Sequence, residues 1–294
     1  MHESILVYRN RRYLWVALGL IALSLLAYAF HRSPQPPNGG TWLGYTLGTI
    51  GALLILWLTA YGVRKRRYSS SAGKVEGWLS AHVYLGTALL LVATLHAGFQ
   101  VGWNVHTLAY VLMWITVLSG FYGVYAYARY PTLMSDNRGN LTLEQMLEAV
   151  AQIDTQCLRL VRNMPEDIRE VVTSAVNRTV VGGNAIQQLS GKDYSQVVIP
   201  ADKSGNFKMA GNAHQDTAIE WLARRLAEST DSEVNNCINE IERLLAGKKQ
   251  MLAKINTDIR LQARLQFWLY LHIPLAIALI AALLIHIISV FLYW

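Results

Sequence analysis

The chain has 294 residues, of which 53% are hydrophobic and only 15% are charged, and its mean hydropathy is +0.24. This composition is typical of a membrane protein with one substantial polar part. The net charge of +7 could indicate nucleic acid, but the basic residues cluster beside apolar segments, so we attribute the charge to membrane orientation and expect no nucleic-acid partner.

Five apolar segments are each about 18–27 residues long, the length that a helix needs to cross a bilayer. They are residues 13–30, 42–63, 78–99, 107–128 and 267–293. The first has a basic start and an Ala-Tyr-Ala sequence that resembles a signal-peptide cleavage site, and we interpret it as an uncleaved signal anchor.

The distribution of Lys and Arg predicts the orientation of these spans. Basic residues precede the first span and lie between the second and third, whereas the 31–41 loop has only Arg32 and the 100–106 loop has none. Because the basic side is the cytoplasmic side, we expect a multi-pass protein of the bacterial inner membrane with a cytoplasmic N-terminus and a periplasmic C-terminus. The third and fifth spans then both run outward and are parallel.

About 135 polar residues separate the fourth and fifth spans, and their two ends share one pattern. Apolar residues alternate by three and four in both, which is a heptad seam. The first arm has Leu143, Met146, Val150, Ile153, Cys157 and Leu160; the second has Val234, Ile238, Ile241, Leu245, Lys248, Leu252, Ile255 and Ile259. We expect a cytoplasmic helical hairpin, a coiled coil, whose second arm runs unbroken into the fifth span despite Gly247.

Local signals refine this polar segment. Thr142 and Gln145 form a possible capping box at the start of the first arm. Pro165 starts a short helix, and 218–227 indicates another. Residues 179–212 are rich in Gly, Asn, Ser and Lys, so we predict a loop with one or two small strands near 197–199.

Four histidines occupy two of the spans at one repeated spacing. His82 and His96 are separated by 13 residues, and so are His272 and His286. Fourteen steps turn through about 1400°, close to four full turns, and rise about 21 Å, so each pair projects from one face with one ring near each side of the membrane. We expect His82 to lie level with His272 on the inner side, and His96 with His286 on the outer side.

Two bis-histidine b haems fit this geometry. Ionisable or strongly polar residues inside a span are costly, and the alternative that all four are interhelical hydrogen-bonding groups leaves the matched spacing unexplained. Zinc or copper would need the ligands within a few ångströms, which a separation of about 21 Å forbids for all four. Bis-histidine ligation saturates the iron and favours electron transfer over oxygen binding.

Small residues accompany the histidines. Gly86 lies one turn past His82 and could let a porphyrin approach the backbone. Other small residues lie in the second and fourth spans, for which helix packing is the alternative explanation: Gly44, Gly48, Gly51, Ser119, Gly120 and Gly123.

Cations and donors near the span ends are candidate partners of haem propionates. On the inner side these are Arg67, Lys74 and Arg129, and on the outer side His31, Arg32, Trp103, Asn104 and His106. Three interpretations are open for His106: a propionate partner, a group that handles a quinol proton, or a surface histidine without a role.

Motifs for other chemistry are missing from the sequence. There is no CxxCH, no CxxC, no GxGxxG after a strand and no Walker motif, and Cys157 and Cys237 are far apart. Electrons must therefore enter and leave through other molecules, and no catalytic residue is predicted.

On these histidines the chain resembles the di-haem transmembrane cytochromes b. Residues 42–128 and 265–294 form a four-helix core with histidine pairs on its second and fourth helices, as in the cytochrome b/b6 core, and ferric-reductase and NADPH-oxidase membrane domains look similar. The resemblance implies haem ligation by the four histidines only. The Pro-Glu-Trp-Tyr quinol motif is absent and the hairpin is foreign to the family, so a bc-type quinol oxidation site is not implied.

The predicted fold is thus an all-α membrane protein of five transmembrane helices, the last four forming a di-haem bundle. Its parts are an N-terminal anchor and outer loop (1–41), three bundle helices (42–129), the hairpin insertion (130–264) and the final haem-ligating helix (265–294).

Three functions are open. The leading one is an electron-transfer subunit of a larger respiratory complex, shuttling electrons between the quinone pool and a redox subunit such as a cytochrome c, an iron–sulfur protein or a flavoprotein. The second is a ferric-reductase-like or oxidase-like core fed by a separate cytoplasmic flavoprotein. The third is a non-redox scaffold or sensor, which the heptad seams suit.

Overall fold

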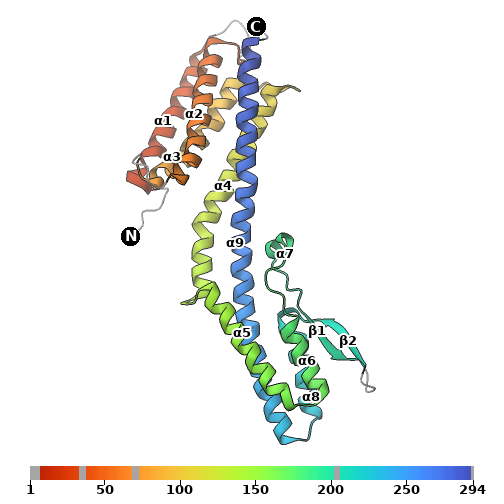
Figure 1. The fold of residues 1–294 in the computed structure, drawn as a ribbon. Helices are drawn as coiled ribbons and strands as arrows, with labels where there is room; N and C mark the ends of the chain where they lie inside the picture. The colour runs from red at the N-terminus through yellow and green to blue at the C-terminus, as the bar shows by residue number, and fades with distance from the viewer. Residues whose placement is uncertain (1–6, 33–37, 68–72, 202–205, 293–294) are drawn as a thin grey trace. The chain divides into compact units, whose positions relative to one another are not determined.

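The protein was analysed as a computed structural model that describes residues 7–32, 38–67, 73–201 and 206–292 (Figure 1). The chain divides into two compact units. Unit 1 comprises Met1–Ala126 and Trp268–Trp294, and unit 2 comprises Tyr127–Phe267. Residues 127–267 contain as many acidic as basic side chains, so the whole net charge of +7 resides in unit 1.

The five predicted spans are confirmed as helices that are long and apolar enough to cross a membrane. They are α1 (Tyr8–Phe30), α2 (Trp42–Arg66), α3 (Val75–Ala97), α4 (Val105–Arg138) and the last part of α9 (Ser232–Leu292). The main difference from the sequence prediction is α4, which continues ten residues beyond the expected end at Ala128 and contains Pro131. Polarity ends the apolar run, but the helix itself continues as long as its backbone hydrogen bonds are made, even through residues of low helix propensity such as Thr132, Asp136 and Asn137.

Side-chain caps and glycine set several helix ends in unit 1. The Thr41 hydroxyl accepts a hydrogen bond from the Gly44 amide at 3.0 Å and begins α2. The Asn104 side chain accepts one from the Thr107 amide at 2.9 Å at the start of α4. α3 ends at Gly98, whose φ of 58° is a left-handed conformation that glycine adopts without strain.

Helices α2, α3, α4 and α9 share one apolar cluster in unit 1. Its buried members come from all four helices: Ile55, Leu58, Leu89, Met113, Leu279 and Leu283. α1 packs against α3, where a side chain on Gly77 would meet the Tyr8 ring at 2.9 Å. Because lipid offers no hydrophobic driving force between helices, such close contacts hold a bundle together through packing.

Unit 2 contains α5 (Leu143–Leu160), α6 (Glu166–Asn177), α7 (Ala185–Ser190), β1 (Gln196–Pro200), β2 (Phe207–Gly211), α8 (Asp216–Glu228) and the first part of α9. The predicted capping box of Thr142 and Gln145 is present. The helices expected after Pro165 and near 218–227 are α6 and α8. The second arm runs unbroken into the fifth span as α9, as predicted.

Most of the predicted heptad positions are buried in unit 2. α5 contributes Met146, Val150 and Cys157, and α9 contributes Ile238, Ile241, Leu245, Lys248, Leu252 and Ile255. Met146 and Val150 cluster with Leu252 and Ile255, whereas Cys157 clusters with Ile238, Ile241 and Leu245. The residue order along the two helices is therefore opposite, so α5 packs antiparallel to α9.

The segment 179–212 contains more structure than the sequence indicated. β1 and β2 form an antiparallel pair with Val197 opposite Ala210. The Ser174 hydroxyl on α6 accepts from the Val198 amide at 2.9 Å, so α6 covers the free edge of β1. α7 was not predicted; a second capping box, formed by Asn184 and Gln187, starts it.

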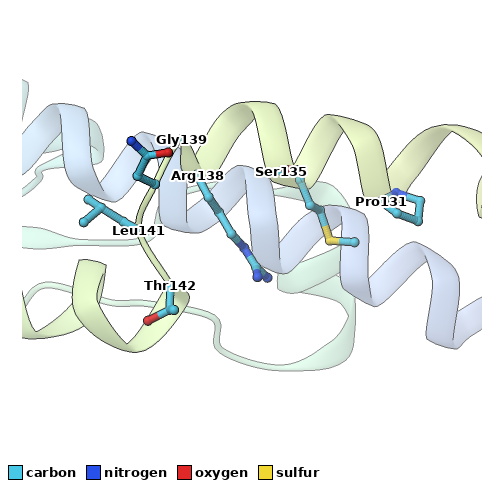
Figure 2. Close-up of a pocket in the computed structure, with 8 residues that line it drawn as sticks. Pro131, Ser135, Arg138, Gly139, Leu141 and Thr142 are labelled. Atoms are coloured by element: carbon cyan, nitrogen blue, oxygen red, sulfur yellow. The ribbon is translucent and has the colours of Figure 1, made fainter. Parts of the chain in front are cut away.

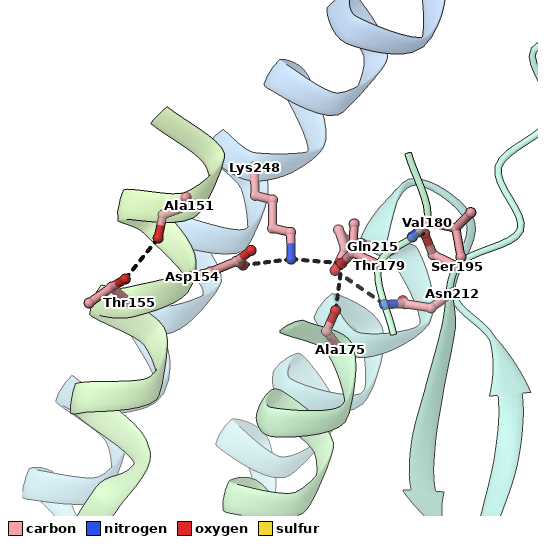
Figure 3. Close-up of polar contacts among 10 residues, drawn as sticks. All are labelled: Ala151, Asp154, Thr155, Ala175, Thr179, Val180, Ser195, Asn212, Gln215 and Lys248. Atoms are coloured by element: carbon pink, nitrogen blue, oxygen red, sulfur yellow. Dashed lines mark hydrogen bonds and ion pairs between the residues drawn. The ribbon is translucent and has the colours of Figure 1, made fainter. Parts of the chain in front are cut away.

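Lys248 is the one polar residue of the seam and is completely buried. Its ammonium donates to the Asp154 carboxylate at 2.6 Å and to the Thr179 hydroxyl at 2.8 Å (Figure 3). The Thr179 hydroxyl donates in turn to the Ala175 carbonyl at 2.7 Å. A buried charge must be paired and hydrogen-bonded, and these contacts do this for Lys248. The same network joins α5, α9 and the end of α6.

A second ion pair fixes the α4–α5 turn to α9 within unit 2. Arg138 forms a two-pronged pair with the fully buried Asp258, with nitrogen–oxygen distances of 2.5 and 2.6 Å. Beside Arg138 lies an open pocket of about 360 Å³, lined by residues of α4 and of the turn that follows, from Pro131 to Thr142 (Figure 2).

Candidate functional site

The four predicted histidines lie in unit 1, two on α3 and two on α9. Midway between the members of each pair lie Leu89 and Leu279, seven residues from either histidine. Both leucines are buried members of the apolar cluster shared by α2, α3, α4 and α9. Apolar packing therefore occupies the space between an inner and an outer level of imidazoles.

Both α3 histidines bind backbone carbonyl oxygens of α2 through Nδ1. His82 Nδ1 lies 3.1 Å from the carbonyl oxygen of Leu58, and His96 Nδ1 lies 2.8 Å from that of Gly44. These two acceptors are fourteen residues apart, as the two histidines are. α2 thus supplies both carbonyl acceptors, at the same spacing along the chain as the two histidines.

Both α9 histidines bind side chains of α4 through Nδ1. His272 Nδ1 lies 2.7 Å from the Ser119 hydroxyl. His286 Nδ1 lies within hydrogen-bonding distance of His106 Nδ1. Each of the four rings therefore has its Nδ1 engaged, while no described residue forms a hydrogen bond with any of their Nε2 atoms.

These contacts fix the proton on two of the rings. A carbonyl oxygen only accepts, so His82 and His96 must each carry a proton on Nδ1. The Ser119 hydroxyl lies 2.7 Å from both the Thr116 carbonyl and His272 Nδ1, and when its proton is donated to the carbonyl its oxygen accepts from His272. A neutral imidazole with its proton on Nδ1 has its lone pair on Nε2, which is the form that ligates a metal.

The outer rings are close to each other. The ring centres of His96 and His286 lie 6.0 Å apart, with their planes at 89°. Two imidazoles that share one metal ion through bonds of about 2 Å have ring centres roughly 6 Å apart. The spacing at this level would therefore allow both rings to bind one metal ion.

The inner rings have aromatic neighbours instead of each other. The His82 ring lies 5.1 Å from the Tyr61 ring, and the His272 ring lies 5.1 Å from the Trp268 ring at an angle of 29°. Among the described residues, His82 and His272 make no ring contact with one another.

The glycines of α2 make room for His96. A side chain on Gly48 would meet His96 Cε1 at 2.7 Å, and one on Gly39 would meet the same atom at 3.2 Å. Gly44 supplies the carbonyl that holds the ring. Gly86 is buried, and the nearest atom to a side chain there would be Leu58 Cδ1 at 3.9 Å, in the residue whose carbonyl holds His82.

Trp268, Ser119 and Gly123 form the support of His272. The Trp268 indole N–H donates to the Ser119 carbonyl at 2.6 Å, and any side chain on Gly123 would overlap the indole ring. The sequence marked Ser119 and Gly123 only as small residues. Their common role has no sequence signature beyond small residues on α4 opposite a large one on α9.

His106 is the one outer polar candidate that contacts a predicted ligand. Its ring centre lies 4.4 Å from that of His286, with the planes at 88°. Asn104 is used as the cap of α4, and Trp103 is fully exposed. The structure thus places His106 beside His286, and its role stays a prediction.

No protein-family model matches the chain, and neither a curated protein nor a solved structure matches it. What the fold defines is a multi-pass membrane protein with a second, polar unit.

Proposed function

We propose that the protein is a membrane-bound b-type cytochrome subunit that transfers electrons across the membrane between the quinone pool and a redox partner. The inner ligands are His82 and His272, and the outer ligands are His96 and His286. The observation that carries the proposal is the shared bonding pattern of the four rings: Nδ1 is held and Nε2 is left unengaged in each.

This pattern supports haem better than it supports simple interhelical hydrogen bonding. A histidine that only ties two helices together needs a single bond, and nothing requires its other nitrogen to stay unengaged. A metal-ligating histidine almost always donates its second ring N–H to a carbonyl or similar acceptor, which orients the ring and raises its basicity. When bound, two bis-histidine haems would supply one-electron redox chemistry without an open coordination position.

The chain's residues perform three tasks in this function. α2 and α4 hold the imidazoles through their Nδ1 atoms. The apolar cluster around Leu89 and Leu279 excludes water between the two levels. Gly48 leaves space beside His96, where a side chain would come within 2.7 Å of the ring.

The charge distribution supports a bacterial inner-membrane location. Arg64, Lys65 and Arg66 form the last turn of α2, which marks that end as cytoplasmic by the positive-inside rule. The N-terminus and residues 130–264 then lie in the cytoplasm and the C-terminus in the periplasm. In that orientation unit 2 is available to a cytoplasmic redox partner or to a neighbouring subunit of a respiratory complex.

The test is the visible spectrum and haem content of the purified full-length protein. We expect two haems per chain with b-type α bands in the reduced form, and a loss of about half in His96→Leu, because one of two sites loses an axial ligand. Leu108→Ala is the control, a change of an exposed apolar residue near the same end of α4 as His106. A colourless wild-type protein, or an undiminished spectrum in His96→Leu, would refute the assignment.

The electron donor separates this function from the second candidate, which uses the same ligands. If quinol reduces the haems in membranes, the quinone-linked subunit stands. If quinol does not and a flavoprotein does, the protein is the core of a ferric-reductase-like or oxidase-like enzyme. A protein that never binds haem would instead be a scaffold or sensor.

A further inference from the structure

His286 is the one predicted ligand whose Nδ1 partner is another imidazole. The partners of His82 and His96 are carbonyls, which can only accept. The partner of His272 is the Ser119 hydroxyl, which accepts when its proton is donated to the Thr116 carbonyl. The His106 Nδ1 atom accepts in the same way when the His106 ring carries its proton on Nε2.

We propose that His106 is the positioning residue of the outer site: it accepts the His286 Nδ1 proton, and so directs the His286 Nε2 lone pair to the metal. This inference rests on the proposed function. His106 then completes the set of four acceptors and is the counterpart, one level out, of Ser119. The two acceptors lie on the same helix, with twelve residues between them.

The ring geometry is compatible with an acceptor role. The two rings meet edge to face at 88°, with the Nδ1 atoms of both at the contact. The His106 Nδ1 atom is thereby committed to His286. His106 is also exposed. The His286 ring centre lies 6.0 Å from that of His96, which is the partner expected at the outer site.

An acceptor on Nδ1 has a measurable electronic effect. It increases the electron donation from the ligand to the iron, which stabilises the oxidised form and lowers the reduction potential. Removing His106 should therefore raise the potential of one haem only. Removing the Ser119 hydroxyl should raise the potential of the other.

The experiment is a redox titration of the full-length protein, with haem content measured in parallel. His106→Leu removes the acceptor at similar volume, and His106→Ala removes it without adding apolar bulk should the first variant fail to accumulate. His106→Gln restores a side-chain oxygen acceptor. Ser119→Ala is the matched variant for the inner site, and Leu108→Ala, at an exposed residue of α4, is the control on the same helix as His106.

We expect two haems in every variant, an upward shift of one titration component in His106→Leu and His106→Ala, and its partial reversal in His106→Gln. Ser119→Ala should shift the other component, and Leu108→Ala neither. Loss of one haem in both His106→Leu and His106→Ala would overturn the proposal, since His106 would then be an axial ligand. Unchanged potentials would overturn it as well. A wild-type protein without haem would instead refute the proposed function itself.

Discussion

Gly48 offers the sharpest test of how the outer site is built. A methyl group at this position would lie 2.7 Å from His96 Cε1 and 2.9 Å from Nδ1. Carbon atoms in favourable contact are about 3.5 Å apart, so in Gly48→Ala the ring must retreat by roughly 0.8 Å. That movement would stretch the 2.8 Å bond from His96 Nδ1 to the Gly44 carbonyl beyond hydrogen-bonding range.

The cost follows from the bond that is lost. A buried donor left unsatisfied costs about 1–3 kcal/mol, which corresponds to a roughly 5- to 150-fold weaker hold on the outer haem. The ring also loses the contact that fixes its tautomer, so the Nε2 lone pair is no longer guaranteed. We therefore expect Gly48→Ala to lower the haem content towards one per chain on dilution or washing, while the inner haem stays.

The assay is haem per protein in the purified, washed variant, with two controls on the same helix. A side chain on Gly51 would find its nearest atom, Leu89 Cδ1, at an ordinary 3.7 Å, and one on Gly62 would find nothing within 4 Å. Gly51→Ala and Gly62→Ala should both retain two haems. Two haems with unaltered affinity in Gly48→Ala would show that the ring does not occupy the position on which this reasoning depends.

Two further substitutions test the supports of the inner site and of unit 2. Gly123→Ala should displace the Trp268 indole and weaken the inner haem, measured as loss of one titration component, whereas Gly120→Ala, where the nearest ring atom is 3.7 Å away, should not; equal behaviour of the two would contradict the packing argument. Lys248→Met leaves the Asp154 carboxylate without its partner. Breaking such a buried pair costs about 3 kcal/mol of stability. This loss corresponds to roughly 100-fold faster amide hydrogen exchange in α5. Adding Asp154→Leu should restore most of the protection, because the unpaired charge is gone; unchanged exchange in the single variant would show that the pair contributes nothing.

The features that the sequence predicted well are those with a strong period. The heptad alternation anticipated a buried position for Lys248, and an apolar run of sufficient length anticipated each of the five spans. The sequence pattern did not predict where α4 ends. Hydropathy reports where the apolar segment stops near Ala128, whereas helical backbone continues through Pro131 wherever its hydrogen bonds can be satisfied.

The supports of the histidines were beyond the reach of the sequence for another reason. Leu58 and Gly44 act through backbone carbonyls, so their side chains carry no signal of the role. A backbone oxygen inside a helix is normally used by the helix itself, and its second lone pair accepts an additional bond only when a donor is packed against it. Such a contact depends on the rotation of α2 against α3, which no local pattern specifies.

The hydrogen bonds at Nδ1 and the equal spacing of the histidines together constrain function more than either does alone. Equal spacing of His82 and His96 on one helix is compatible with any repeated structural contact. Hydrogen bonds at Nδ1 of all four rings would also occur in a helix bundle that merely satisfies its polar groups. Both features occur together here, with an apolar layer around Leu89 between the levels, and at each level the nitrogen that a metal needs is the one left unengaged. A hydrogen-bonding scaffold gains nothing from leaving Nε2 unengaged at every site, since each unsatisfied polar atom in a membrane is costly.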